Sequence, residues 1–105
     1  SGNQEDHVSM GTTGARTAAM VLDNTEKILG IEIIEAAQGI WLRQEIGESK
    51  IENLAPATRA AYEFIRTKSD PVDQDVILHD ELVKFDEMIK DNSLLEAVEK
   101  VVTIK

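Results

Sequence analysis

With 105 residues, of which 42% are hydrophobic and 30% charged, the chain is long enough for one domain or for part of a larger one. Its net charge of -9 argues against nucleic acid and against an anionic membrane surface as partners. The absence of cysteine excludes a disulfide scaffold and a thiolate metal site. No run of about 20 apolar residues predicts a membrane span, and no apolar leader is visible, so the cytoplasm is the expected compartment.

A long first helix is predicted from about residue 12 to residue 46, because apolar side chains recur there at spacings of three and four. A threonine at position 12 or 13 would cap it, and a start as early as Asn3 also remains open. Gly11 and Gly14 predict a kink or a short break, and Gly47 predicts the end of the helix. The apolar residues with this spacing are Ala15, Ala18, Ala19, Leu22, Leu29, Ile33, Ala36, Ala37 and Ile40.

The stretch ILGIEIIEAAQGIWL, residues 28–42, is apolar around nearly the whole circumference of this helix. A surface helix carries one apolar stripe, whereas only Glu32, Glu35 and Gln38 interrupt the apolar surface here. Such a helix needs neighbours on several sides, and the rest of the chain supplies too few. We therefore expect the chain to associate with itself or to expose apolar surface.

Two or three shorter helices complete an all-α fold. The first is expected over about 56–67, since Pro56 suits a first turn and the residue before Pro71 avoids helical geometry. A helix over about 79–90 and a last one over about 93–102 follow, the last with Ser93 and Glu96 as a capping box. The expected apolar faces consist of Ala61, Tyr62 and Ile65 and of Leu82, Phe85, Met88 and Ile89.

A polar cluster, Gln4-Glu5-Asp6-His7, stands near the start of the chain. Adjacent side chains point in different directions on a helix, and the other histidine, His79, is far along the chain, so no metal site is predicted. From the physics of these residues alone, the cluster is a solvated helix start, with acids near the positive end of the helix dipole.

Glu32 and Glu35 are a second candidate, because they lie one helical turn apart within the apolar stretch. Buried carboxylate pairs can do acid–base chemistry, since burial and mutual repulsion raise a pKa. The favoured interpretation is that they form ion pairs with Lys or Arg on neighbouring helices. The sequence shows neither a glycine-rich phosphate loop after a strand nor a Ser–His–acid arrangement.

Three segments in order resemble one family. Residues 3–10 read NQEDHVSM, which matches the signature of the bacterial histidine ammonia-lyases. ARTAAMVLDNTEKILGIEIIEAAQGIWLR resembles the long helix that follows this signature, and LAPATRAAYEFIR at 54–66 resembles the next block. The resemblance covers most of the chain and weakens from Val72 onward. The related phenylalanine and tyrosine lyases carry a different local pattern, closer to HNQDVNSL.

The resemblance implies that residues 1–105 are the C-terminal segment of a much longer enzyme, within the central helical bundle of a homotetramer. That enzyme would convert L-histidine to trans-urocanate and ammonia. Its electrophile, a methylidene-imidazolone, is made from an internal Ala-Ser-Gly, which this chain lacks. We therefore expect the chain to be inactive by itself.

By motif position, Glu5 matches a catalytic glutamate that faces the substrate imidazole and would bind and orient the substrate. Gln4 matches a residue that hydrogen-bonds near the prosthetic group and beside the substrate. Asp6 and His7 receive no role. Two alternatives remain open: another aromatic amino acid ammonia-lyase or aminomutase, and a non-catalytic helical interaction module.

Overall fold

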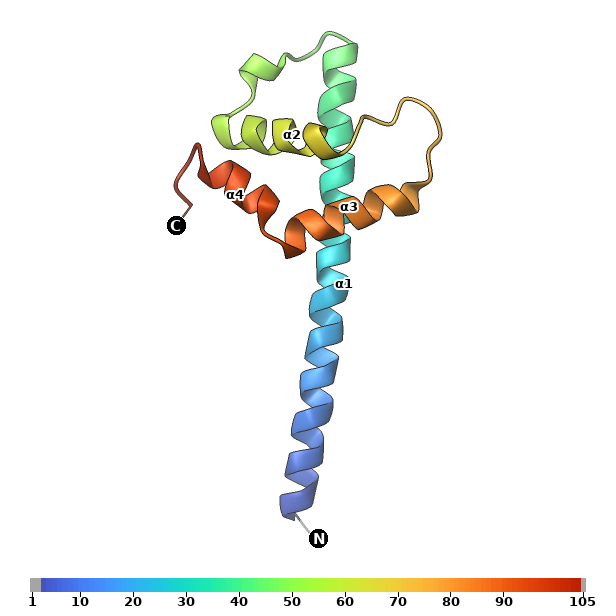
Figure 1. Ribbon diagram of the computed structural model, residues 1–105, viewed down its shortest axis with the longest axis vertical. Helices are drawn as coiled ribbons and strands as arrows, with labels where there is room; N and C mark the ends of the chain where they lie inside the picture. Colours follow the sequence, from blue (N-terminus) through green and yellow to red (C-terminus); the bar gives the residue numbers. More distant parts are fainter. Residues whose placement is uncertain (1–2, 105) are drawn as a thin grey trace.

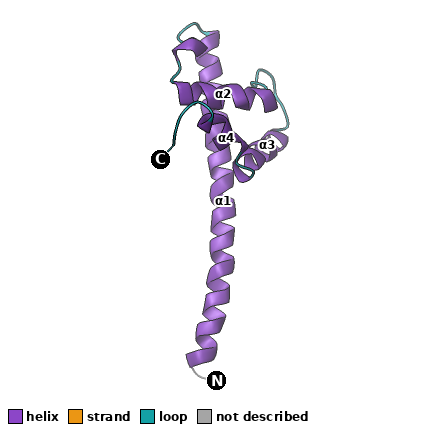
Figure 2. Ribbon diagram, turned by 60° about the vertical axis from the view of Figure 1, so that its left-hand side comes forward, coloured by secondary structure: helices purple, strands orange, loops and turns teal. Residues whose placement is uncertain are grey.

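A computed structural model describes residues 3–104 of the chain, with side chains from Met10 onward. Every regular element in this range is a helix (Figure 2), which confirms the all-α prediction. The elements in chain order are α1 (Asn3–Glu45), the short 3₁₀ helix η1 (Ile51–Asn53), α2 (Pro56–Lys68), α3 (Leu78–Lys90) and α4 (Ser93–Glu99).

The molecule consists of a long rod with a cap at one end (Figure 1). We call α2, α3 and α4 together the cap; they gather around the C-terminal half of α1. Residues 3–22 of α1, which we call the projecting half, extend away from the cap. The radius of gyration is 19.1 Å and the extents are 69 × 36 × 20 Å. A compact chain of this length would have a radius of gyration near ~13 Å.

Helix α1 begins at Asn3, the earlier of the two starts considered, and not near residue 12. Thr13 lies inside the helix, where its carbonyl accepts a hydrogen bond from Thr17 Oγ1 at 3.0 Å. The short break considered near Gly11 and Gly14 is wrong, because α1 is continuous through both. A glycine costs a helix only about 1 kcal/mol relative to alanine, and it leaves the backbone hydrogen bonds in place.

Gly47 ends α1 as predicted. It adopts a left-handed φ of 77°, which glycine reaches without strain. Its N–H donates to the carbonyl of Gln44 at 3.1 Å, and the N–H of Glu48 donates to the carbonyl of Arg43 at 2.9 Å. These two bonds form a Schellman motif, which satisfies carbonyls at the end of a helix.

One small core joins the cap to α1. Phe85 and Met88 of α3 are 2% and 4% exposed, and Gly30 of α1 is buried beside α3. A Cβ atom on Gly30 would lie 3.6 Å from Cβ of Phe85, so the two helices cross closely there. The buried core consists of Ala37, Tyr62, Ile65, Phe85 and Met88, which confirms four of the residues predicted for the apolar faces of α2 and α3. The other three predicted residues, Ala61, Leu82 and Ile89, are half-buried.

Helix α4 is shorter than expected and starts differently. It ends at Glu99 and not near residue 102, because the β-branched Val101 and Val102 disfavour helix and the chain ends the helix in a turn there. The expected capping box is wrong, since Ser93 is already the first helical residue. The N-cap is Asn92, with φ of 62°, and Asp91 Oδ1 accepts a hydrogen bond from the N–H of Ser93 at 2.8 Å.

Candidate functional site

The candidate site residues lie at the tip of the projecting half, far from the cap (Figure 1). Gln4 and Glu5 are in the first turns of α1, and so are Asp6 and His7. Their side chains lie outside the part of the chain whose side chains are described. The roles of Glu5 and Gln4 therefore stay predictions, while the structure gives the helix that carries them.

The surface next to the signature is a shallow apolar groove that α1 forms alone. Its lining includes Met10, Gly14, Val21 and Leu22. Met10 and Leu22 are 72% and 62% exposed. No other described element lies beside this half of α1 in either view (Figures 1 and 2). Because binding sites for small molecules enclose most of the ligand surface, a single helix face supplies one wall of such a site.

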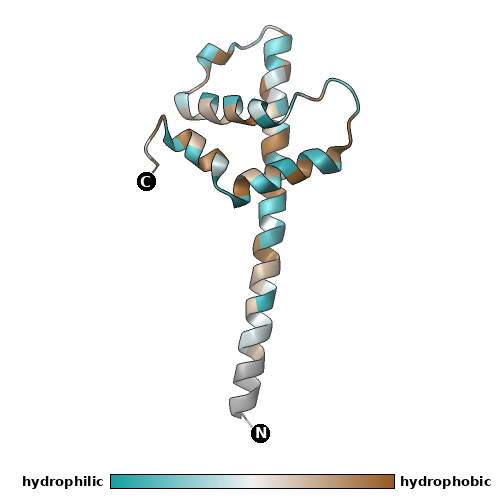
Figure 3. Cartoon of the chain, in the orientation of Figure 1, coloured by the Kyte–Doolittle hydropathy of each residue, from teal (hydrophilic) through white to brown (hydrophobic). Residues whose placement is uncertain are grey.

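The stretch 28–42, which includes strongly apolar turns of α1 (Figure 3), is also only partly covered. Ala37 packs in the core, whereas Ile28 remains 63% exposed and Leu42 remains 47% exposed. This bears out the expectation that the chain by itself exposes apolar surface on this helix.

Glu32 and Glu35 are both exposed, and no ion pair joins either of them to a cation within the described residues. Among the described residues, therefore, Glu32 and Glu35 form neither the buried acid–base pair nor the structural ion pair. The structure also brings neither of them to the signature, since both lie in the C-terminal half of α1.

Gln38 holds the connector between α2 and α3, a role that sequence reasoning missed. Its Nε2 donates to the carbonyl of Val72 at 2.8 Å, and the N–H of Val72 donates to its Oε1 at 3.0 Å. The available signal was a single amide side chain inside an apolar stretch. Such a group needs partners when it is partly buried.

Arg66 fixes the same connector from α2. Its guanidinium donates to the carbonyls of Ala37 at 3.0 Å and Ser69 at 3.2 Å, and it lies 5.0 Å from the ring centroid of Tyr62. The partly buried Arg66 thus ties α1, α2 and the connector together, with a cation–π contact on the aromatic face.

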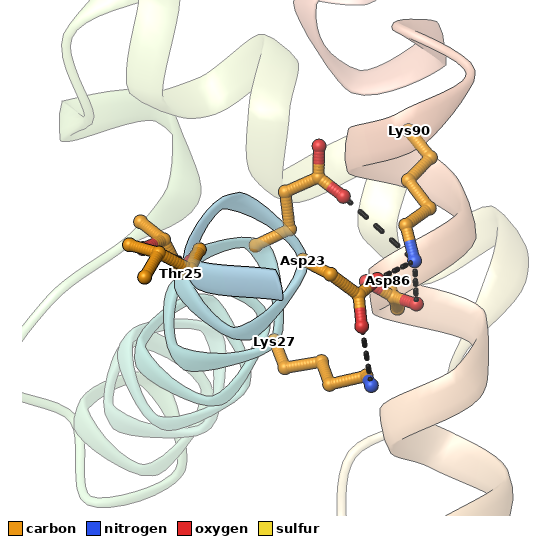
Figure 4. A network of polar contacts seen from close by, with 7 residues as sticks. Asp23, Thr25, Lys27, Asp86 and Lys90 are labelled. Atoms are coloured by element: carbon orange, nitrogen blue, oxygen red, sulfur yellow. Dashed lines mark hydrogen bonds and ion pairs between the residues drawn. The ribbon is translucent and has the colours of Figure 1, made fainter. Parts of the chain in front are cut away.

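An ion-pair network joins α3 to α1 (Figure 4). Lys90 Nζ lies 2.7 Å from Asp23, 2.9 Å from Asp86 and 3.7 Å from Glu26. Lys27 adds a further contact to Asp23 at 2.8 Å. The hydrogen bond from Lys27, and after it the one from Lys90, lowers the pKa of Asp23 from 3.8 to about 2. The hydrogen bonds that Lys90 donates to Asp23 and to Asp86 raise the pKa of Lys90.

A second polar contact joins the connector to α3. The buried Ser69 donates from its hydroxyl to Glu81, and Lys84 Nζ lies 2.9 Å from the other oxygen of this carboxylate. The hydrogen bonds from Lys84 and Ser69 lower the pKa of Glu81. Both polar networks therefore position the cap, and neither lies near the signature.

Neither a metal site nor a membrane-spanning helix is found in the described part of the chain. Its His, Asp and Glu side chains nowhere gather in a group suited to a metal ion. Within residues 3–104, no helix combines the length and hydropathy that crossing a bilayer requires.

Known proteins are similar to this chain along nearly its whole length. The family model described as aromatic amino acid lyase matches residues 1–67. The chain belongs to the aromatic amino acid lyase family. A histidine ammonia-lyase of Symbiobacterium thermophilum is 45% identical over 96% of this chain. Histidine ammonia-lyase 2 of Fusobacterium nucleatum and a histidine ammonia-lyase of Clostridium tetani are 42% and 41% identical over 97% and 100% of it.

The chain spans about a fifth of the length of these lyases, 19% in the first two and 20% in the third. No solved structure matches it. A chain that spans about a fifth of its relatives corresponds to one segment of their fold. This fits the projecting half of α1, which has no neighbours among the described elements.

Proposed function

We propose that this chain is a segment of a histidine ammonia-lyase, which eliminates ammonia from L-histidine to give trans-urocanate. The observation that carries the proposal is the identity of up to 45% to histidine ammonia-lyases along nearly the whole chain. The NQEDHVSM signature, at the start of α1, lies within residues 1–67, which the aromatic amino acid lyase model matches.

In this proposal Glu5 binds the imidazole ring of the substrate. A carboxylate accepts hydrogen bonds from ring N–H groups, and a helix holds it at a fixed place relative to the reacting atoms. Gln4, with an amide that both donates and accepts, would hydrogen-bond the prosthetic group and the substrate beside it. Since one helix face forms one wall, the remaining walls come from other parts of the enzyme.

The prosthetic group proposed is methylidene-imidazolone, an electrophile that makes the substrate amine a better leaving group. Its residues of origin are not in this chain, because none of its five serines stands between Ala and Gly. The chain can therefore supply residues beside the group, and we expect residues 1–105 alone to be inactive.

The uncovered apolar surface of α1 supports self-association, in a homotetramer for the full-length enzyme. Helices of a bundle bury apolar residues on several sides, and α1 exposes Met10, Val21, Ile28 and Leu42 in the isolated chain. The cytoplasmic location expected from the sequence stays a prediction.

The test replaces Glu5 in the full-length polypeptide by Gln, which keeps the size of the side chain and removes its charge. We expect urocanate formation, followed by absorbance, to fall by at least tenfold. The matched control is Glu99→Gln, an exposed residue at the end of α4, which should leave the rate unchanged. Unchanged activity in Glu5→Gln would show that Glu5 does not contact the substrate.

A related aromatic amino acid lyase or aminomutase is the second candidate, because the matching family model describes the aromatic amino acid lyases in general. Assays of the full-length enzyme with histidine, tyrosine and phenylalanine separate the two candidates. A preference for tyrosine or phenylalanine would overturn the assignment to histidine.

A further inference from the structure

Three residues in a row on α1 have an acid at one end and a base at the other. The row is therefore complementary in charge to an antiparallel copy of itself. Glu35, Gly39 and Arg43 follow one another at intervals of four residues, so they form one ridge along the helix. An acid precedes the glycine by one turn, and a base follows it by one turn. Reversing the direction of the helix exchanges the places of the two charges.

This row faces away from the core. Ala37 is buried, and Gly39 comes two residues later, which is a rotation of roughly 200° on an α-helix. Nothing lies within 4 Å of the position that a Cβ atom on Gly39 would occupy. Glu35 is exposed, and the side chain of Arg43 is 66% exposed, with one loose contact of 3.8 Å to Glu48.

We propose that two copies of this chain cross antiparallel at Gly39, with Glu35 of each copy paired to Arg43 of the other. Each charge lies about 6 Å along the axis from the crossing point, so the acid of one copy is level with the base of its partner. The inference rests on the self-association proposed above and gives it a direction, a crossing point and a pair of contacts.

The surface beside the row fits this arrangement. A groove of about 530 Å³ runs along it, with Ile31 and Ile34 of α1 on one side and Leu78 and Leu82 of α3 on the other. In the antiparallel crossing, Leu42 and Ile46 of the second copy lie level with residues 36 and 32, beside this groove. Ile46 is 66% exposed in the single chain and would be covered there.

Charge favours the antiparallel direction over the parallel one. A parallel pair in register would place Glu35 beside Glu35 and Arg43 beside Arg43, and like charges at an interface are repulsive. The chain as a whole has a net charge of -9, so two copies repel each other at long range. Reciprocal ion pairs at the contact are attractive and set the direction at the same time.

A cysteine at the crossing point tests the geometry directly, because the chain has no cysteine of its own. In Gly39→Cys the two thiols would meet, and a disulfide needs Cα atoms about 4.4–6.8 Å apart. In the control Asn24→Cys, exposed on the same helix, the two thiols would be roughly 45 Å apart along the axis. On mild oxidation we expect a covalent dimer from Gly39→Cys alone.

Charge reversal provides a second test that does not alter the glycine. Glu35→Arg and Arg43→Glu should each weaken dimerisation at least tenfold by sedimentation equilibrium, and the double variant should restore it. Glu99→Arg, an exposed acid on α4, is the control and should leave dimerisation unchanged. Circular dichroism checks that every variant keeps the helical content of the parent chain.

Three results would overturn the proposal: a parent chain that stays monomeric, equal cross-linking at positions 39 and 24, and a double variant as weak as the single ones. A monomeric chain would assign the row to another segment of the longer polypeptide. Urocanate formation by the full-length enzyme is a separate readout. Normal activity without cross-linking at Gly39 rejects only the crossing, and cross-linking without activity rejects only the proposed function.

Discussion

The two halves of α1 differ in what surrounds them, although they form one continuous helix. In the projecting half Met10 and Leu22 are 72% and 62% exposed, and no other described element covers them. In the C-terminal half Ala37 is 3% exposed, and α3 crosses closely at Gly30. Since single helices are marginally stable in water, tertiary contacts stabilise the second half, whereas the first half has no such contact with the other described elements.

The largest expected difference between the halves concerns apolar truncation. Phe85→Ala removes the most buried side chain of the core and should lower the free energy of unfolding by about 3–5 kcal/mol. Met20→Ala, a truncation at a position 66% exposed on the projecting half, should change it by less than about 0.5 kcal/mol. Urea unfolding followed by circular dichroism measures both.

Equal losses in the two variants would contradict the division of α1 into a packed and an unpacked half. The measurement is made at low protein concentration, so that association through α1 does not cover Met20. A repeat at high concentration shows whether partners protect the projecting half.

An intermediate effect is expected at the contact that holds the α2–α3 connector. Gln38→Ala leaves the N–H and carbonyl of Val72 without their partner and should cost about 1–3 kcal/mol. Gln74→Ala, in the same connector but exposed, is the matched control and should be neutral within about 0.5 kcal/mol. Hydrogen exchange of the Val72 amide reports the lost bond directly, and unchanged exchange would show that the contact does not form in solution.

Acid should weaken the attachment of α3 to α1. The pKa of Asp23 is lowered on folding from 3.8 to about 2, so its ion pairs stabilise the fold above pH 3.8 and are lost as the pH falls towards 2. Asp23→Asn should therefore unfold at a lower urea concentration than the parent chain at pH 6. The difference between the two should disappear between pH 4 and pH 2.

Asp75→Asn, in the exposed connector, is the control for this titration and should follow the parent chain at every pH. A difference between Asp23→Asn and the parent chain that persists at pH 2 would show that Asp23 acts through its shape and not through its charge.

The sequence predicted the helices well because their signals are local. Pro56 and Gly47 mark helix ends by backbone geometry alone, and the apolar spacing of α3 identifies its buried face. The prediction for the start of α4 was wrong although the side chain of Ser93 is able to cap a helix. The N-cap residue is Asn92, which precedes Ser93 and has a left-handed backbone. Whether a side chain is able to cap a helix follows from its own chemistry, but whether it does so depends on the backbone of the preceding turn.

The sequence predicts where the candidate site lies on the chain, but it does not predict which residues surround Gln4 and Glu5. The signature residues Gln4 and Glu5 are placed on a helix, and the walls opposite them would come from segments distant in sequence. Contacts such as those of Gln38 to Val72 or Lys90 to Asp23 were missed for the same reason. They join residues that come together only after the cap packs on α1, and helical periodicity carries no information about such pairs.

The smallest expected effect comes from adding one methyl group to each half of α1. Gly30→Ala would place a Cβ 3.6 Å from Phe85 and 3.7 Å from the amide nitrogen of Asp86, which are ordinary contacts. Replacing a helical glycine by alanine favours the helix by about 1 kcal/mol, so Gly30→Ala should stabilise the packed half by up to that amount. Gly14→Ala meets nothing within 4 Å and should raise the helical signal without shifting the unfolding midpoint of the cap. An equal shift of the midpoint in both variants would show that the two halves of α1 unfold as one cooperative unit. Stabilisation at position 14 changes the unfolding of α2, α3 and α4 only if the whole of α1 unfolds together with them.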